Sequence, residues 1–246
     1  MARIYNKPPL IEAVCDFRFS SSQPWDWTIP GLFYEQIRDS FPIKNQISSI
    51  ETTVDPNEHK VVQQALPKMQ FVNQEGTAVI HVGPDNLTIH QLPPYDSWEH
   101  FKSHILKYLS VYRGTAHSEN LANVILRYVN RINIPQADFE LDSYFRVIPQ
   151  VPNPVPQIFQ EFLLNIDVPY QSLQGVLRLT FGTVNPEGEA KHAYLLDLSM
   201  YSLAFAVPSI DEISGWLDTA HEHIEAAFDA AFTERTHCEI FEEVNK

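Results

Sequence analysis

Hydrophobic and polar residues alternate at the start of the chain and predict a strand. Apolar residues occupy every second position from Ile11 to Phe19, the pattern of a strand with one buried face. Short alternating segments separated by turn residues then predict three further strands, at Met69–Val72, Thr77–Val82 and Leu87–Leu92. Helical spacing predicts a short helix within 30–41 and a long one from Trp98 to about Gly114.

The same order of elements returns after residue 120. A strong strand is predicted over Val124–Ile134 and a short helix near Asp142–Val147. A second three-strand meander is predicted at Phe162–Val168, Val176–Val184 and Ala193–Tyr201. A long helix from about Ser209 to Phe232 ends the pattern.

These elements predict an α+β fold. We expect a duplicated unit of strand, short helix, three-strand meander and long helix, with mainly antiparallel sheets packed on helices. The two halves would be residues 1–119 and 120–246. Because no long polar linker separates them, we expect one integrated domain rather than two independent ones.

Charge and composition narrow the classes of partner. The chain of 246 residues has a formal net charge of −14, so we expect no non-specific binding to nucleic acid or to an anionic membrane. No apolar run reaches the length of a membrane span. The first residues show no export signal and there are only two cysteines, Cys15 and Cys238, so we expect a reducing, cytoplasmic setting.

More than half of the net charge lies at the C-terminal end. From Ser209 onward there are ten acidic residues and only two basic ones. Apolar residues at three- and four-residue steps in the same segment predict a helix face that packs inward. The outward acids include Asp218, Glu222, Glu225 and Asp229. Three interpretations stay open: a solvated helix face, a docking surface for a basic partner, or metal binding.

Charged residues on two predicted strands form a second candidate site. Arg127 and Arg131 share one strand face, with Asn133 beyond them. On the opening strand Glu12 and Asp16 are also four apart, and Arg18 lies beyond them. Two arginines could clamp a carboxylate or phosphate. The alternative is a structural ion-pair ladder that joins the two halves.

Recognisable catalytic and cofactor motifs are absent from the sequence. We find neither glycine-rich phosphate motif, and no HExxH, GxSxG, SxxK or CxxC. The catalytic residues, if there are any, stay unknown. We predict no metal site and no cofactor, and whether the protein is an enzyme stays open.

Three segments together resemble a known family. They are Pro8-Pro9-Leu10-Ile11-Glu12-Ala13, Leu126-Arg127-Tyr128-Val129-Asn130-Arg131-Ile132, and Leu217-Asp218-x-x-His221-x-x-Ile224-x-x-x-Phe228. The set is similar to a sporadically distributed, functionally uncharacterised prokaryotic family of about this length. The resemblance implies a small, soluble, microbial protein with patchy inheritance, which is typical of defence and mobile-element neighbourhoods.

Two function hypotheses follow from these observations. The first is a non-enzymatic protein-binding or regulatory protein, acting on a partner such as a toxin or defence effector as inhibitor, antitoxin, chaperone or adaptor. The second is a small-anion binder or enzyme that uses Arg127 and Arg131 between the two halves. Beside these two, a third option is acidic mimicry of DNA toward nucleic-acid-binding proteins, which needs carboxylates spaced like phosphates on one surface. A homo-oligomer is open under each of them.

Overall fold

The computed structural model describes residues 3–20, 24–55, 60–116, 120–156, 159–203 and 209–244; within the second and third strands, the side chains of residues 49–66 are not described. The chain divides into two compact units that are interleaved in sequence. One unit comprises residues 1–13, 126–203 and 216–246, and we call it the C-terminal unit. The other comprises residues 14–125 and 204–215, and we call it the N-terminal unit.

Within the described ranges, nine strands are hydrogen-bonded in the order β2-β3-β4-β5-β1-β6-β9-β8-β7. Two of them, β1 (Leu10–Phe19) and β6 (Leu121–Ile134), contribute residues to both units. Strands that follow one another in the chain pair antiparallel, both from β2 to β5 and from β7 to β9. The α+β class with a mainly antiparallel sheet is therefore confirmed.

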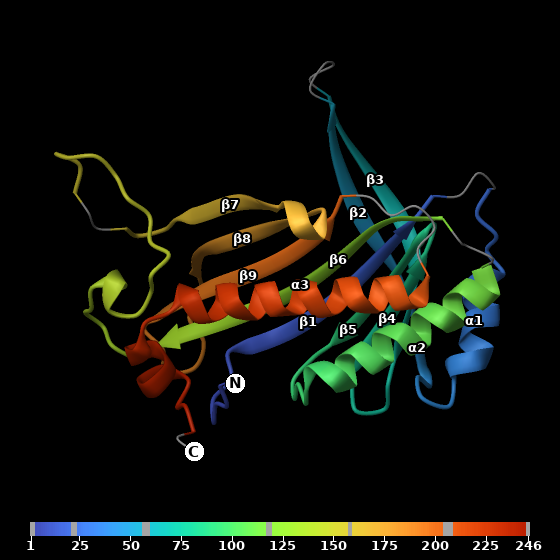
Figure 1. Cartoon of the computed structure of the whole chain (residues 1–246), viewed down its shortest axis with the longest axis horizontal. Helices are drawn as coiled ribbons and strands as arrows, with labels where there is room; N and C mark the ends of the chain where they lie inside the picture. The colour runs from blue at the N-terminus through green and yellow to red at the C-terminus, as the bar shows by residue number, and fades with distance from the viewer. Residues whose placement is uncertain are drawn as a thin grey trace. The chain divides into compact units, whose positions relative to one another are not determined.

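The N-terminal unit is a four-strand meander with two helices. The strands are β2 (Ile43–Asp55), β3 (Lys60–Val72), β4 (Ala78–Gly83) and β5 (Asn86–Gln91). The helices are α1 (Ile29–Ile37) and α2 (Trp98–Ala116), which lie side by side in Figure 1. Their buried aromatic side chains meet the sheet, as where the rings of Phe33 and Phe71 lie 6.0 Å apart. The sequence predicts three strands in this meander, whereas the structure has four, because the hydrophobic pattern does not predict β2.

In the C-terminal unit the strands carry residues 216–231 of a long helix, whose first residues, 210–215, belong to the N-terminal unit. The strands β7 (Leu163–Tyr170), β8 (Gly175–Val184) and β9 (His192–Ser202) form the meander, and α3 spans Ile210–Ala231. Trp216 on α3 donates an indole hydrogen bond of 3.2 Å to the carbonyl oxygen of Leu173. The ring of His223, farther along α3, lies 4.4 Å from that of Tyr170. Both contacts bring α3 to the β7–β8 connection, where a single-turn helix covers Gln171–Leu173.

The predicted short helix at Asp142–Val147 is wrong in extent. Only Leu141–Ser143 form a single 3₁₀ turn. Tyr144 keeps a helical backbone conformation, and the Phe145 N–H still donates to the carbonyl oxygen of Leu141 at 3.0 Å. Phe145 then forms an isolated antiparallel bridge with Phe232, and the Arg146 N–H donates to the carbonyl oxygen of Ala231 at 2.8 Å. Pairing with the end of α3 therefore takes the place of further helical hydrogen bonds after this turn.

Two described segments near the ends of the chain, residues 4–7 and 241–244, pair with each other in the C-terminal unit. A short π-helix covers Thr236–Ile240, and beyond it Glu243 pairs with Tyr5 in an antiparallel bridge. Backbone hydrogen bonds flank this bridge, from Asn6 to Glu242 and from Val244 to Ile4. They hold residues 4–7 beside the C-terminal segment.

The chain halves show a similar order of elements, with four strands between the helices of the first half and three in the second. The duplication and the integrated domain stay predictions. No helix in the described ranges combines the length and apolar character needed to cross a bilayer.

Candidate functional site on the C-terminal helix

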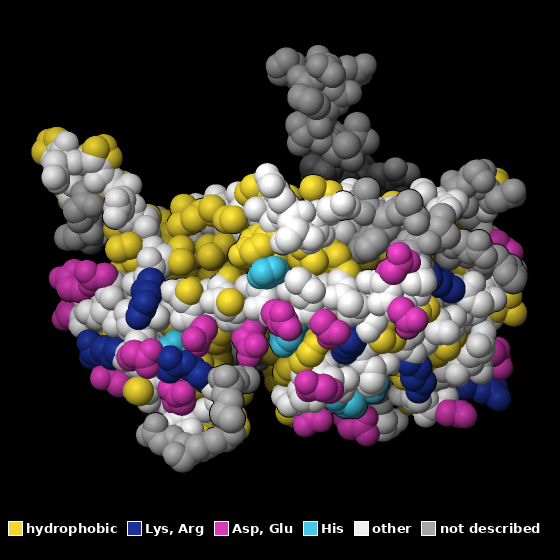
Figure 2. Space-filling view, in the orientation of Figure 1, with side chains coloured by type: hydrophobic (Ala, Val, Ile, Leu, Met, Phe, Trp, Pro, Cys, Tyr) yellow, Lys and Arg dark blue, Asp and Glu magenta, His cyan; other side chains and the backbone are white. Residues whose placement is uncertain are grey.

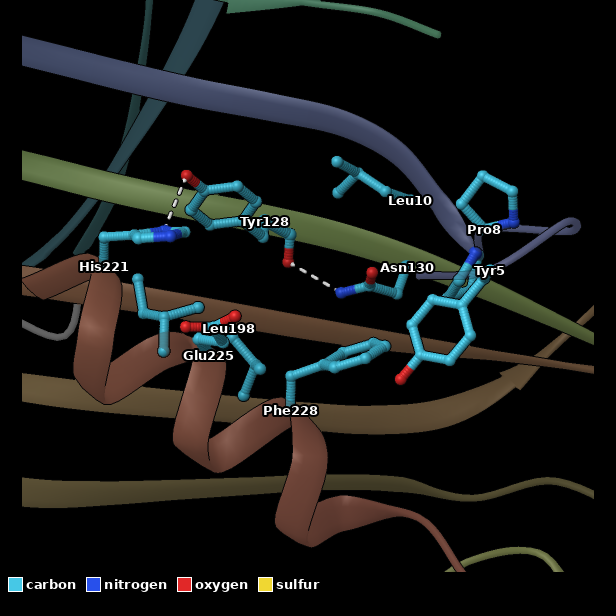
Figure 3. A pocket seen from close by; sticks show the side chains of 11 residues that line it. Tyr5, Pro8, Leu10, Tyr128, Asn130, Leu198, His221, Glu225 and Phe228 are labelled. Atoms are coloured by element: carbon cyan, nitrogen blue, oxygen red, sulfur yellow. Dashed lines mark hydrogen bonds between the residues drawn. The ribbon is translucent and has the colours of Figure 1, made fainter. Parts of the chain in front are cut away.

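A small apolar hollow lies within the C-terminal unit, between α3, the strands β6 and β9, and the N-terminal segment. Figure 3 shows its walls. Its volume is about 160 Å³. The lining side chains are mostly apolar or aromatic: Tyr5, Pro8, Pro9, Leu10, Tyr128, Asn130, Leu198, His221, Ile224, Glu225 and Phe228. We call this cavity the apolar hollow.

The few polar groups deep in the apolar hollow already have partners. The Tyr128 hydroxyl and Nδ1 of His221 lie 3.1 Å apart, which joins β6 to α3 (Figure 3). The buried Asn130 donates from its amide nitrogen to the carbonyl oxygen of Leu196 at 3.3 Å. Burial of an unpaired polar group costs free energy, and these bonds satisfy the amide nitrogen and the hydroxyl. The hollow can therefore accept an apolar group.

A second, acidic hollow of about 490 Å³ shares part of its lining with the first. It is lined by Arg3, Tyr5, Glu222, Glu225, Ala226, Phe228 and Asp229. Tyr5, Glu225 and Phe228 line both hollows. Glu222, Glu225 and Asp229 are exposed, and Figure 2 shows acidic side chains gathered along α3.

Arg3, the one basic residue of the acidic hollow, is paired with carboxylates. Its guanidinium nitrogens lie 2.9 Å from Asp229, 2.7 Å from Glu234 and 2.7 Å from Glu243. The hydrogen bond to Glu234 is the largest of several causes that raise the pKa of Arg3 above its ordinary value. Because three carboxylates surround one cation, Arg3 does not make the hollow positive.

The side chain of Tyr5, which lines both hollows, is held by the buried His237. The Tyr5 hydroxyl and Nδ1 of His237 are 2.8 Å apart, and their rings stack at 5.8 Å. Burial lowers the pKa of His237 below its ordinary value, and the charge of Arg3 adds to this. His237 is therefore neutral at neutral pH, so Nδ1 can accept the hydrogen bond that Tyr5 donates.

The two predicted strand arginines have separate acidic partners. Arg127 makes a two-pronged contact with Asp197 on β9, with Nε 2.9 Å from Oδ1 and the terminal nitrogen 2.7 Å from Oδ2. This hydrogen bond raises the pKa of Arg127, and the nearby charge of Glu12 adds to it. Arg131 lies 3.3 Å from Glu187 and donates to the carbonyl oxygen of Asn185. The arginines thus face different partners rather than one shared anion.

The other charged residues of the opening strand belong largely to the N-terminal unit. Asp16 accepts hydrogen bonds from Asn86 at 2.5 Å and from Thr88 at 2.7 Å. Arg18 lies 3.2 Å from the same carboxylate. Glu12 and Asn133 belong to the C-terminal unit, and Oδ1 of Asn133 is buried with no hydrogen-bond partner among the described residues.

The outward acids of α3 divide into two groups. Glu222, Glu225 and Asp229 line the acidic hollow, while Asp218 is half-buried one turn earlier. Within the described part of the chain, no cluster of three or more potential metal ligands occurs. Both cysteines are free thiols; Cys15 is buried, which raises its pKa well above the ordinary value, and Cys238 is exposed.

Most of the residues that line the apolar hollow lie in the three segments on which the family resemblance was based. Pro8, Pro9 and Leu10 belong to the first segment, Tyr128 and Asn130 to the second. The third contributes His221, Ile224 and Phe228. Tyr5 and Leu198, in contrast, carried no signal in the sequence.

Comparisons with known proteins add little to this site. No protein-family model matches the chain. No curated protein matches it either. One similar solved structure, the crystal structure of DynU16 from the dynemicin biosynthetic locus, covers 91% of this chain and 98% of its own. The sequence identity is 12% and the TM-score is 0.26, so this likeness supports no argument about fold or function.

Proposed function

We propose that this protein is a non-enzymatic binding protein that engages a partner protein through α3. The observation that carries the proposal is the apolar hollow, which α3 helps to line, beside exposed carboxylates of the same helix. Interfaces draw most of their binding energy from a few anchor side chains that fill pockets. Complementary charge around such an anchor favours association and the choice of partner.

The size of the apolar hollow fits one anchor side chain. A cavity of about 150 Å³ holds a benzene ring, and this one measures about 160 Å³. Burying a Phe or Leu side chain contributes roughly 1.5–3 kcal/mol. One anchor therefore supplies only part of a stable interface, and the exposed face of α3 would supply further contacts.

A capture experiment with matched variants tests the proposal. The wild-type protein is used as bait in a lysate of its native host, beside Leu10→Trp, which fills the apolar hollow, and Glu225→Lys, which reverses a charge on its rim. Glu189→Lys is the control, because Glu189 is an exposed carboxylate of the same unit outside both hollows. It changes the net charge by the same amount.

The expected result is a protein that wild type and Glu189→Lys retain and that both hollow variants lose. Its retention should weaken as salt rises, because exposed charges are screened. Equal retention of the same proteins on all four baits, or no retained protein at low salt, would contradict the proposal.

A further inference from the structure

The apolar hollow and the acidic hollow meet along a common wall, and this adjacency limits what a partner can present. Tyr5 and Phe228 form this wall with their rings 6.5 Å apart and edge to face. Glu225 lies four residues after His221 and therefore on the same face of α3. A group in the apolar hollow and a group in the acidic hollow would thus lie side by side.

The apolar hollow selects against a charged group at its inner end. Tyr128 and His221 bind each other, and the amide nitrogen of Asn130 is engaged by backbone. Leu198 and Ile224 supply buried apolar surface beside them. An ionised group placed there would lose its hydration without gaining a partner of opposite charge. A branched aliphatic or aromatic side chain meets no such cost.

The acidic hollow selects for a cation. Its three carboxylates outnumber its single guanidinium, and that guanidinium is also held by Glu234 and Glu243 outside the lining. Lys7, the next basic residue along the N-terminal segment, lies 2.6 Å from Glu242. A carboxylate or phosphate entering here would meet repulsion, whereas an ammonium or guanidinium would meet Glu222 and Glu225.

We infer that the partner segment presents an aromatic or branched apolar side chain next to a Lys or Arg side chain, the first entering the apolar hollow and the second entering the acidic hollow. This inference rests on the proposed function and specifies the chemistry of the partner. The long apolar stem of Lys or Arg can cross the Tyr5 and Phe228 rings while its charge reaches the carboxylates.

Short peptides test this chemistry with the purified full-length protein. The probes are acetyl-Phe-Lys-Gly-amide and three relatives: norleucine in place of Lys, Glu in place of Lys, and Ala in place of Phe. Norleucine keeps most of the apolar stem and removes the ammonium. Binding is followed by two-dimensional amide NMR, which also reports whether the affected signals belong to α3 and to residues 4–10.

The Phe-Lys peptide should bind about three- to tenfold more tightly than the norleucine peptide at low salt, the range expected for one cation near two exposed carboxylates. The Glu and Ala peptides should bind more weakly still. Glu225→Gln should remove most of the preference for Lys over norleucine, whereas Glu189→Gln should leave it unchanged. Leu10→Trp should abolish binding of the Phe peptides.

Equal affinity for the Lys and norleucine peptides would overturn the inference, as would affected signals outside the two hollows or no binding by any peptide. None of these results bears on the capture experiment, which tests partner binding without assuming the partner's chemistry. Loss of the captured protein without a peptide preference would therefore reject the inference and retain the proposed function.

Discussion

The pair of Arg127 and Asp197 provides the sharpest test of what the strand arginines do. If the pair is structural, Asp197→Asn should destabilise the fold. The substitution keeps the side-chain shape but removes the negative charge that accepts three hydrogen-bond contacts of 2.7–3.0 Å from Arg127. If Arg127 is instead held for an anionic ligand, its loss should affect ligand binding more than stability.

The size of the effect follows from the burial of the two side chains. Asp197 is 15% exposed and Arg127 41%. Breaking a fully buried pair costs about 3–5 kcal/mol, and an exposed pair contributes roughly 0.2–1 kcal/mol. The half-exposed guanidinium places Asp197→Asn between these limits, at about 1–3 kcal/mol of unfolding free energy. Glu12 also attracts Arg127, which favours the lower half of this range.

A double-mutant cycle isolates the pair from other effects of each substitution. Asp197→Asn, Arg127→Gln and the double variant are unfolded in urea at fixed pH and ionic strength, followed by circular dichroism. We expect a coupling free energy of about 1–2 kcal/mol. A coupling below about 0.3 kcal/mol, within the additivity expected of independent sites, would refute a stabilising role for the pair.

Three further predictions concern the C-terminal unit. Burial holds the pKa of His237 below its ordinary value of 6.5. The stabilisation that neutral His237 gives the folded state is therefore present above about pH 6.5 and is lost as the pH falls through the lower folded-state pKa. When the pH is lowered from 7.5 to 5.5, the urea midpoint should drop less in His237→Gln than in wild type. In Gly182→Ala the added Cβ would lie 2.8 Å from the carbonyl oxygen of Phe162, and separation of the two backbones should lower the thermal midpoint, an outcome that an unchanged midpoint would contradict. Ile224→Ala should cost about 2–5 kcal/mol of unfolding free energy and enlarge the apolar hollow, since Ile224 is 3% exposed; urea unfolding measures the first and a crystal structure the second.

Hydrophobic periodicity was sufficient to locate much of the secondary structure. It located β1, β6, the strands of the second meander and the two long helices, because a buried face imposes period two on a strand and period 3.6 on a helix. It did not reveal β2, whose opening residues Lys44, Asn45 and Gln46 are polar. That strand forms by pairing with β3 from Ile43 opposite Val72 to Asp55 opposite Lys60, and backbone hydrogen bonds leave little trace in composition.

The candidate sites, like the secondary structure, could be predicted only in part from the sequence. The sequence placed Arg127 and Arg131 on one strand face and the acids Glu222, Glu225 and Asp229 on the last helix, because these are consequences of local geometry. It could not show that Arg127 pairs with Asp197, seventy residues away in the chain. Spacing along a strand determines which face a side chain occupies, whereas strand order determines what lies opposite.

The apolar hollow could not be predicted from the sequence, because its residues come together only in the tertiary structure. Its walls come from an N-terminal segment, two strands and the last helix, and its polar groups face one another only when α3 lies on β6. The sequence by itself determined the elements and the charge on them. The tertiary structure decided which charges are neutralised and where an empty apolar volume remains, because both depend on contacts between residues distant in the chain.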